Sequence, residues 1–531
     1  MNSFGSVKFL GGTADGDSLL TGSCILVAIQ CGRRKVRFLV DIGAIQCSKD
    51  FYTKNREILD ELKLSQLDGI IITHPHNDHV GLLPLLVKNG FDGKVIYTKE
   101  TAEILPFMLA DSAKIQAREC ARNRNKRLRV MGRLKHVRHK FSMKDLDKRE
   151  CNSKLVKKKI IMKLPNEVPL YSLEDVERSC ELVKGNGFVY EKWFKLFDCD
   201  LQIKLYHSGH VLGGAICVVK VRRDEGDVYL AFGGDLGRDD GVILEAPRMV
   251  REPIDYWFTE STYGDRFHPD VVSEINYFAK RMKEADRENK TVIIPTLALR
   301  GPDMVALVSS FRLAIPVHVH SNLVRGVIGI FASSWKTGQL AKKLNLDFNP
   351  FCEREHKNLS FVYGKANLWS KKGQKMARVI IATSGRCDHG PVAEYLSHYL
   401  CDPNALIFLV NYMAENTLGR RLANIATDIN GVTKSDKPRM IYVHKKKIFV
   451  KAEIIQFKSF SGHADCLGLV EYSKQLILKN KRKHTVVFAI HGSRESASCF
   501  KEALLAALDN KHYSPDNIII PKLKQEIALL A

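Results

Sequence analysis

A histidine-rich segment that follows a short apolar run constrains this chain more than any other feature. Gly69 to Thr73 is a β-branched run typical of a buried strand, and Pro75 prevents that strand from continuing as a paired ladder. Four side chains that can bind a metal therefore fall in the loop after the strand: His74, His76, Asp78 and His79. Imidazole nitrogens and carboxylates suit borderline metals such as zinc. An exposed His-rich loop is the alternative, but packing rarely places three histidines and an aspartate so close together, so we predict a metal centre.

Length and composition indicate an intracellular globular enzyme with two domains. The 531 residues exceed one ordinary hydrophobic core. We find no targeting segment and no apolar run long enough to cross a bilayer, so we expect a cytoplasmic protein, or a nuclear one in a eukaryote, without a membrane partner. The thirteen cysteines are dispersed and form no Cys-x-x-Cys pair, which is typical of reduced thiols and leaves histidines and carboxylates as metal candidates.

The formal charge of +23 indicates a polyanionic partner, either nucleic acid or an anionic membrane surface. Nucleic acid is favoured because no amphipathic anchor accompanies the charge. The segment from Arg118 to Lys163 contains eighteen Lys and Arg and four Asp and Glu. Its formal charge is therefore +14, out of +23 for the whole chain. We interpret this segment as a basic insertion, partly helical, that could track a phosphate backbone. A solvated charged face is the alternative, and the near absence of aromatic residues argues against base stacking there.

Two more metal candidates follow predicted strands. The strand Leu201–Tyr206 leads into a glycine-flanked segment that contains His207 and His210. We favour His210 as the ligand because His207 directly ends the strand. The strand Val228–Phe232 delivers Asp235 between glycines, and the two oxygens of such a carboxylate can bridge two cations.

Further functional candidates also lie at strand ends. A predicted strand over Tyr256–Phe258 leads to Glu260. Asp41 ends a region of antiparallel hairpins and its carboxylate could orient a metal ligand, although Asp is also a common turn residue. A parallel α/β module follows, and one of its strands ends at Ser384 and Gly385, which we predict to form a phosphate-binding turn.

In sequence order these segments resemble the motifs of metallo-β-lactamase-fold nucleases of the β-CASP family, and the resemblance spans nearly the whole chain. It rests on Asp41, His74–His79, Gly209–Gly213, Gly234–Gly237, Glu260–Gly264, Ala382–Gly385, Ala414–Gly419, Phe460–Asp465 and Ile490–Gly492. The chain resembles the shorter archaeal and other prokaryotic relatives of RNase J and of the cleavage and polyadenylation endonuclease.

The resemblance implies an α/β fold, namely a metallo-β-lactamase αββα sandwich with an inserted parallel α/β β-CASP domain. The first domain would comprise 1–263, with the basic insertion at about 118–163, and would be completed by 456–531. The β-CASP domain would comprise 264–455. Two departures from the family pattern fall in this inserted domain, at Leu299–Asp303 and at Gly385–Gly390. At the second of these segments the family commonly has Gly-Met-Leu-Thr-Gly-Gly.

The resemblance also implies roles for individual side chains. Two Zn²⁺ ions would be bound, one by His74, His76 and His210 and the other by Asp78, His79 and His491, with Asp235 bridging them. His463 would be the general acid, oriented by Glu260, and Asp41 would support the ligands. A histidine at the position of His491 resembles the RNA-processing branch, because DNA-processing members typically carry valine there.

These observations predict a zinc-dependent nuclease that hydrolyses phosphodiester bonds in RNA, as an endonuclease, a 5′–3′ exonuclease or both, in RNA processing or decay. RNA is the predicted partner, and a homodimer is compatible with the sequence. Three alternatives remain open: a DNA nuclease of the same fold, a non-catalytic RNA-binding scaffold, and a small-thioester or lactam hydrolase. The scaffold is disfavoured because no ligand is missing, and the small-molecule hydrolase because of the inserted domain and the charge.

Overall fold

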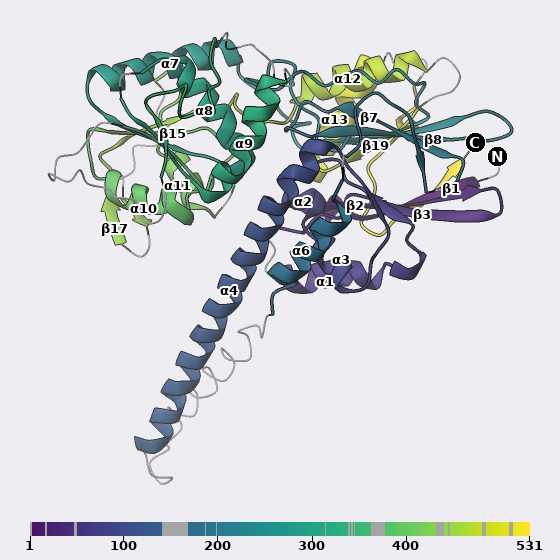
Figure 1. The fold of residues 1–531 in the computed structure, drawn as a ribbon, viewed down its shortest axis with the longest axis horizontal. Helices are drawn as coiled ribbons and strands as arrows, with labels where there is room; N and C mark the ends of the chain where they lie inside the picture. Colours follow the sequence, from purple (N-terminus) through teal and green to yellow (C-terminus); the bar gives the residue numbers. More distant parts are fainter. Residues whose placement is uncertain are drawn as a thin grey trace.

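Two β-sheets, each built from distant parts of the chain, face each other in the first domain of the computed structural model (Figure 1). The structure describes residues 3–530 except 16–17, 47–49, 141–167, 186, 198, 314, 338–339, 341–343, 345, 363–377, 415, 432–439, 444–445, 481–484 and 509–512. The first sheet has the order β21 (Glu526–Leu530), β1 (Ser3–Asp15), β2 (Ser18–Cys31), β3 (Arg34–Val40), β4 (Gly69–Ile71) and β5 (Lys94–Ile96). The expected antiparallel hairpins β1–β2 and β2–β3 are confirmed, whereas β3, β4 and β5 are parallel.

The second sheet has the order β20 (Ile518–Ile519), β19 (Val486–Ile490), β10 (Tyr256–Glu260), β9 (Val228–Phe232), β8 (Ala215–Val221), β7 (Leu201–His207) and β6 (Phe194–Leu196). Aromatic side chains fill the space between the sheets, and the rings of Phe258 and Phe488 stack with centroids 4.6 Å apart. The stacked rings and the tilted contact of Phe9 with Phe488 hold strands from both ends of the chain together.

Helices cover the outer faces of both sheets and complete the predicted αββα sandwich. The apolar cluster beside the first sheet includes residues of α1 (Phe51–Asp60), α2 (Asn77–Val80), α3 (Leu83–Lys88) and α6 (Leu173–Leu182). The second sheet is covered by α12 (Cys466–Lys479) and α13 (Arg494–Ala507). Ser172 caps α6, because its hydroxyl accepts a hydrogen bond from the backbone N–H of Asp175 at 3.2 Å.

The second domain is built on a fully parallel sheet, as the alternating strands and helices predict. Its strand order is β13 (Leu359–Phe361), β12 (Val317–His320), β14 (Val379–Ala382), β11 (Thr291–Pro295), β15 (Ala405–Leu409) and β18 (Glu453–Gln456). The accompanying helices are α7 (Val271–Arg287), α8 (Gly301–Ser310), α9 (Asn322–Lys336), α10 (Gly390–Tyr399) and α11 (Leu418–Ala423). Every residue of β11, β14 and β15 is buried, because helices cover both faces of a parallel sheet.

Smaller elements complete the described chain. They are the hairpin of β16 (Met440–Val443) and β17 (Lys446–Phe449) and the 3₁₀ turns η1 (Leu64–Gln66), η2 (Ala298–Arg300) and η3 (Pro515–Asn517). Among the described helices, none is both long enough and apolar enough to cross a membrane.

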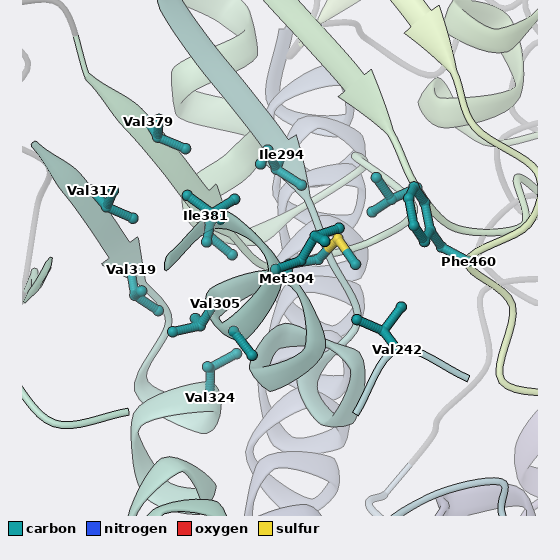
Figure 2. Close-up of a cluster of buried hydrophobic side chains, with 14 of the residues drawn as sticks. Val242, Ile294, Met304, Val305, Val317, Val319, Val324, Val379, Ile381 and Phe460 are labelled. Atoms are coloured by element: carbon teal, nitrogen blue, oxygen red, sulfur yellow. The ribbon is translucent and has the colours of Figure 1, made fainter. Parts of the chain in front are cut away.

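The two domains share buried apolar side chains. Val242 and Phe460 of the first domain lie in the same cluster as Ile294 and Met304 of the second, and Figure 2 shows these side chains beside one another. Because such contacts are close-packed, they hold the two domains in a fixed relation. The loops at the domain boundary are therefore positioned from both sides.

Helix α4 (Lys99–Lys140) is longer than the sequence pattern predicts and extends far beyond the rest of the molecule (Figure 1). The sequence predicts a helical region from Glu100 to about Ala117, and the structure continues this helix to Lys140, through the first part of the basic insertion that we interpreted as partly helical. The residues that follow Ala117 are mainly Arg, Lys and Asn around a few Leu, Val and Met, and Arg, Lys and Leu have high helix propensity without needing a packed face. The remainder of the basic insertion, 141–163, lies outside the described residues.

Candidate metal centre

The candidate ligands meet at one edge of the sandwich because parallel strands deliver them there. Asp41 follows β3, and the segment from His74 to His79 follows β4, which pairs with β3 in parallel. In the other sheet β9, β10 and β19 run parallel, so Asp235, Glu260 and His491 also come to a common edge. The loops that carry His210 and Asp235 lie close together, since a methyl group at Gly237 would overlap the backbone of Gly209 and His210.

The first cluster consists of His74, His76, His210 and Asp235, with their nearest ligand atoms facing one another. Nδ1 of His76 lies 3.0 Å from Nε2 of His74 and 3.2 Å from Nε2 of His210. Oδ2 of Asp235 lies 3.5 Å from Nε2 of His74 and 3.4 Å from Nε2 of His210. Ligands about 2.0–2.1 Å from a tetrahedral zinc ion are about 3.3 Å from one another. The cluster therefore has the dimensions of a zinc site.

The second cluster consists of Asp78, His79 and His491 and lies on the other side of the same aspartate. Oδ1 of Asp235 lies 3.2 Å from Nε2 of His79 and 3.3 Å from Nδ1 of His491. Nε2 of His491 lies 3.7 Å from Oδ2 of Asp78. Each carboxylate oxygen of Asp235 thus faces one cluster, which is the arrangement of a bridging ligand.

Three buried atoms at the second cluster fit a bound cation. Nε2 of His79, Nε2 of His491 and Oδ1 of Asp235 have no partner with hydrogen-bond geometry among the described residues. A buried polar atom without a partner costs about 1–3 kcal/mol. A divalent cation between these atoms would remove that cost, so the donor set fits a metal ion.

The protonation of the two clusters differs. Burial, reinforced by neighbouring imidazoles, holds the pKa values of His74 and His210 well below the ordinary value. Burial likewise lowers the pKa of His76 to about 4, although nearby carboxylates oppose it. Burial also opposes the charge on His79, but Asp235 and Asp41 outweigh burial and raise the pKa of His79 well above the ordinary value. The three histidines of the first cluster are therefore uncharged and can bind a cation at pH 7, whereas His79 in the second cluster carries a proton that a cation would displace.

Asp41 orients one of these ligands. Its Oδ2 accepts a hydrogen bond from Nδ1 of His79 at 2.7 Å, which directs Nε2 of the same ring toward Asp235. Thr73 fixes the Asp41 carboxylate, because its backbone N–H and its hydroxyl each donate to it at 2.8 Å. Sequence reasoning missed Thr73, although its position directly before His74 was a usable signal.

A third cluster joins Asp235, Glu260 and His463. Nδ1 of His463 donates to Oε2 of Glu260 at 2.8 Å, so Nε2 is the nitrogen left for a substrate. Glu260 is fully buried and also accepts from the backbone N–H of Leu236, whereas the His463 side chain is 21 % exposed. Burial disfavours the imidazolium, but Glu260 and Asp235 outweigh this effect and raise the pKa of His463 to about 9. His463 is therefore protonated at neutral pH and accessible to a ligand.

The loop that carries His463 is held by two charged side chains that sequence reasoning missed. The buried carboxylate of Glu274, on α7, accepts from the backbone N–H groups of Lys458 and Ser459, each at 2.8 Å. Arg300, beside α8, donates to the carbonyl of Phe460 at 3.0 Å. Both residues belong to the second domain, so that domain helps to position the loop of the proposed acid. No motif marked Glu274, whereas Arg300 lies in the segment Leu299–Asp303 that departs from the family pattern.

A third missed residue holds the same loop from the first domain. Nη1 of Arg238 donates to the carbonyl of Ser459 at 2.6 Å, and its other guanidinium nitrogens pair with Asp240. Arg238 directly follows Gly237 of the glycine-flanked aspartate motif, which was the available signal.

The structure does not bring every predicted residue to the metal clusters. Ser384 and Gly385 lie at the carboxyl end of β14 in the second domain, and among the described residues no hydrogen bond joins them to the ligands. The hydroxyl of Ser384 is buried and has no hydrogen-bond partner among the described residues. His207 is the last residue of β7 and belongs to none of the three clusters, whereas His210 belongs to the first.

Three family models match successive parts of the chain. The metallo-beta-lactamase superfamily model matches residues 48–151, the Beta-Casp domain model matches 306–422, and the model of the Zn-dependent metallo-hydrolase RNA specificity domain matches 447–515. The second match lies on the parallel sheet, and the third contains His463 and His491.

Curated relatives match most of this chain. The transcription termination factor FttA of Methanocaldococcus jannaschii is 24 % identical over 98 % of this chain and 72 % of its own length. RNase aCSPSF2 of Saccharolobus solfataricus is 22 % identical over 92 % of this chain and 81 % of its own length. The cleavage and polyadenylation specificity factor 73 of Drosophila melanogaster is 22 % identical over 86 % of this chain and 58 % of its own length, so this chain spans little more than half of that relative.

The sandwich and the paired His/Asp clusters at its edge define a metal-dependent hydrolase of the metallo-β-lactamase superfamily. Within that superfamily, the inserted parallel domain and the order of the three matched family models are typical of the β-CASP family. The chain belongs to the β-CASP family of metallo-β-lactamase-fold nucleases.

Proposed function

We propose that this protein is a zinc-dependent ribonuclease that binds two Zn²⁺ ions. The observation that carries the proposal is the position of Asp235, whose two oxygens face two separate ligand clusters while His463 lies beside them. His74, His76 and His210 would hold one ion, Asp78, His79 and His491 the other, and Asp235 would bridge them. Two ions bound there supply Lewis acidity that activates water and neutralises phosphoryl oxygens.

The chain's own residues would provide the remaining chemistry. His463 presents a protonated Nε2 and would donate this proton to the departing oxygen of the scissile phosphodiester. Glu260 keeps that imidazole charged and correctly rotated through its hydrogen bond to Nδ1. Asp41 would act only indirectly, by holding His79.

RNA is the proposed substrate because three observations agree. The chain carries a formal charge of +23, the model of an RNA specificity domain matches its carboxyl-terminal part, and the name of one relative describes it as an RNase. The buried His491 belongs to the second cluster, and a histidine at this position resembles the RNA-processing branch of the family. We propose that Ser384 and Gly385 contact the substrate backbone from the second domain. A homodimer and an intracellular location stay predictions.

The decisive experiment incubates zinc-loaded protein with an internally labelled RNA that carries either a 5′ monophosphate or a 5′ triphosphate. We expect phosphodiester hydrolysis, and internal products or a ladder from the 5′ end will distinguish endonuclease from exonuclease action. A DNA oligonucleotide of the same sequence is the matched control, and its faster cleavage would instead favour the DNA nuclease.

Two variants link any cleavage to the proposed site. His463→Ala should keep both ions and lose most cleavage, whereas Asp78→Ala should lose zinc as well. Undiminished cleavage by His463→Ala would remove the assignment of this residue as the acid. Intact RNA binding without cleavage by the zinc-loaded wild type would favour the non-catalytic scaffold.

A further inference from the structure

The carboxyl-terminal half of α4, from Arg118 to Lys140, forms a basic arm outside the two domains (Figure 1). This basic arm contains ten Lys and Arg and one acidic residue, Glu119. At 1.5 Å per helical residue the arm is about 33 Å long. Such a charged, extended surface plays no part in the chemistry described above.

The first half of α4 is anchored to the first domain by one face of the helix. Gln116 accepts a hydrogen bond from the backbone N–H of Leu170 at 2.9 Å, and the thiol of Cys120 donates to the hydroxyl of Tyr52 at 3.2 Å. Leu109 and Ala113 are buried on the same face. Directly beyond Cys120 the helix loses this burial, since Ala121, Arg122, Arg124 and Asn125 are exposed.

By the helical repeat, six of the ten basic residues of the arm fall on one side of the helix, and the other four, Arg124, Arg127, Lys135 and Arg138, fall on the opposite side. One row, within about 80° of arc at 100° per residue, consists of Arg118, Arg122, Lys126, Arg129, Arg133 and Lys140. By the same helical arithmetic this row lies roughly opposite the anchored face that contains Gln116 and Cys120. We call it the basic row.

The basic row is costly in the absence of an anionic partner. Like charges four residues apart, as at Arg118 and Arg122, repel one another and destabilise a helix. A regular array of phosphates alongside the row would remove this repulsion and release counterions. Charge complementarity therefore identifies the kind of partner that fits.

The origin of the helix connects the arm to the metal centre. The hydroxyl of Thr101, in the first turn of α4, donates to the carbonyl of Gly213 at 2.9 Å, and Gly213 ends the loop that carries His210. From Thr101 to Arg118 the helix covers about 25 Å. The arm therefore begins about 25 Å along the helix from this contact with the loop of His210.

We propose that the basic arm binds the phosphate backbone of an RNA segment that extends beyond the metal centre. The inference rests on the proposed ribonuclease function and adds to it a second, sequence-independent contact that only long substrates reach. An RNA too short to extend from the metal centre along about 25 Å of α4 will not reach the basic row. The arm contains no aromatic residue, so it lacks the interfacial anchors typical of membrane-surface helices and the platforms used to stack bases.

The test compares two triple variants of the full chain. The arm variant carries Arg118→Gln, Arg122→Gln and Arg129→Gln. The control variant carries Lys280→Gln, Lys283→Gln and Arg287→Gln on the exposed face of α7, and it loses the same charge from another helix. Circular dichroism and cleavage of a short RNA should be unchanged in both, which shows that the fold and the metal centre are intact.

Binding of a long single-stranded RNA is measured by fluorescence anisotropy over a series of salt concentrations, in a His463→Ala background that prevents cleavage. The arm variant should bind about tenfold more weakly at low salt, with the slope of log affinity against log salt reduced by about 2, as three lost phosphate contacts require. The control variant should match the parent. Equal behaviour of the two variants would overturn the proposal.

Two further outcomes separate the proposals. If the wild type cleaves no RNA but the arm variant still loses long-RNA binding, the basic arm stands and the nuclease proposal fails. If the arm variant keeps its RNA affinity but no longer binds phosphatidylserine vesicles that the parent binds, the arm proposal fails in favour of an anionic membrane surface.

Discussion

Replacing Glu260 by Gln tests the physical core of the proposed mechanism, because it removes one charge and almost no volume. The carboxylate of Glu260 is fully buried and accepts from Nδ1 of His463 at 2.8 Å. An amide oxygen in the place of Oε1 can keep the hydrogen bond from the backbone of Leu236 and the longer one, 3.1 Å, from this imidazole. What disappears is the negative charge that stabilises the imidazolium of His463.

The size of the effect follows from the pKa of His463. Burial alone would lower this pKa, and the carboxylates raise it to about 9 from an ordinary value of 6.5. In Glu260→Gln we expect a value near or below 6.5, which corresponds to about 3 kcal/mol less stabilisation of the charged ring. A general acid works only while protonated, so cleavage persists below its pKa and is lost as pH rises through it. The variant should therefore lose about 30-fold at pH 8 and less than about twofold at pH 6.

The assay measures kcat on a short fluorescent RNA between pH 5.5 and 9.5, with zinc content determined for each sample. The wild type should lose activity as pH rises through about 9, and the variant should lose it at least one pH unit lower. His463→Ala provides the control, since its residual rate should lack this alkaline limb. A uniform loss for Glu260→Gln at every pH would show that Glu260 acts only through the backbone of Leu236, and would refute the reasoning.

Three further predictions concern the metals and the loop. Asp235→Asn should lose both ions, because each oxygen of Asp235 faces one cluster, whereas retention of both ions by elemental analysis would contradict the bridging role. Because burial lowers the pKa of His76 to about 4, the imidazole of His76 stays uncharged down to that value, so dialysed protein should retain at least one ion at pH 6 and release it at a pH of about 4 or below. Complete release at pH 6 would contradict this. Glu274→Gln should lower the free energy of unfolding in urea by about 2 kcal/mol, because a neutral amide oxygen accepts the hydrogen bonds that converge on Oε2 from Lys458 and Ser459 more weakly than a carboxylate oxygen does. Zinc content should stay unchanged, and an unaltered urea midpoint would show that this contact contributes little.

The local chemistry of the site could be predicted from the sequence. A β-branched run followed by Pro75 places His74 and its neighbours in a loop, and glycines around Asp235 mark a second strand end. These signals are local, because a residue's own neighbours decide where a strand stops. The parallel α/β module was predictable for the same reason, since a fully buried strand such as β14 differs in pattern from the amphipathic helices around it.

Other features depend on distances through space that no local pattern encodes. Only the folded chain shows that one oxygen of Asp235 faces each cluster, that burial keeps His76 neutral, and that Glu274 and Arg300 hold the loop of His463 from the other domain. The length of α4 also escaped prediction, because helix propensity extends the helix after its apolar face has ended. Residue types and strand ends are properties of neighbours along the chain, whereas charge, protonation and support at a buried site are set by atoms that only tertiary packing brings within a few ångströms.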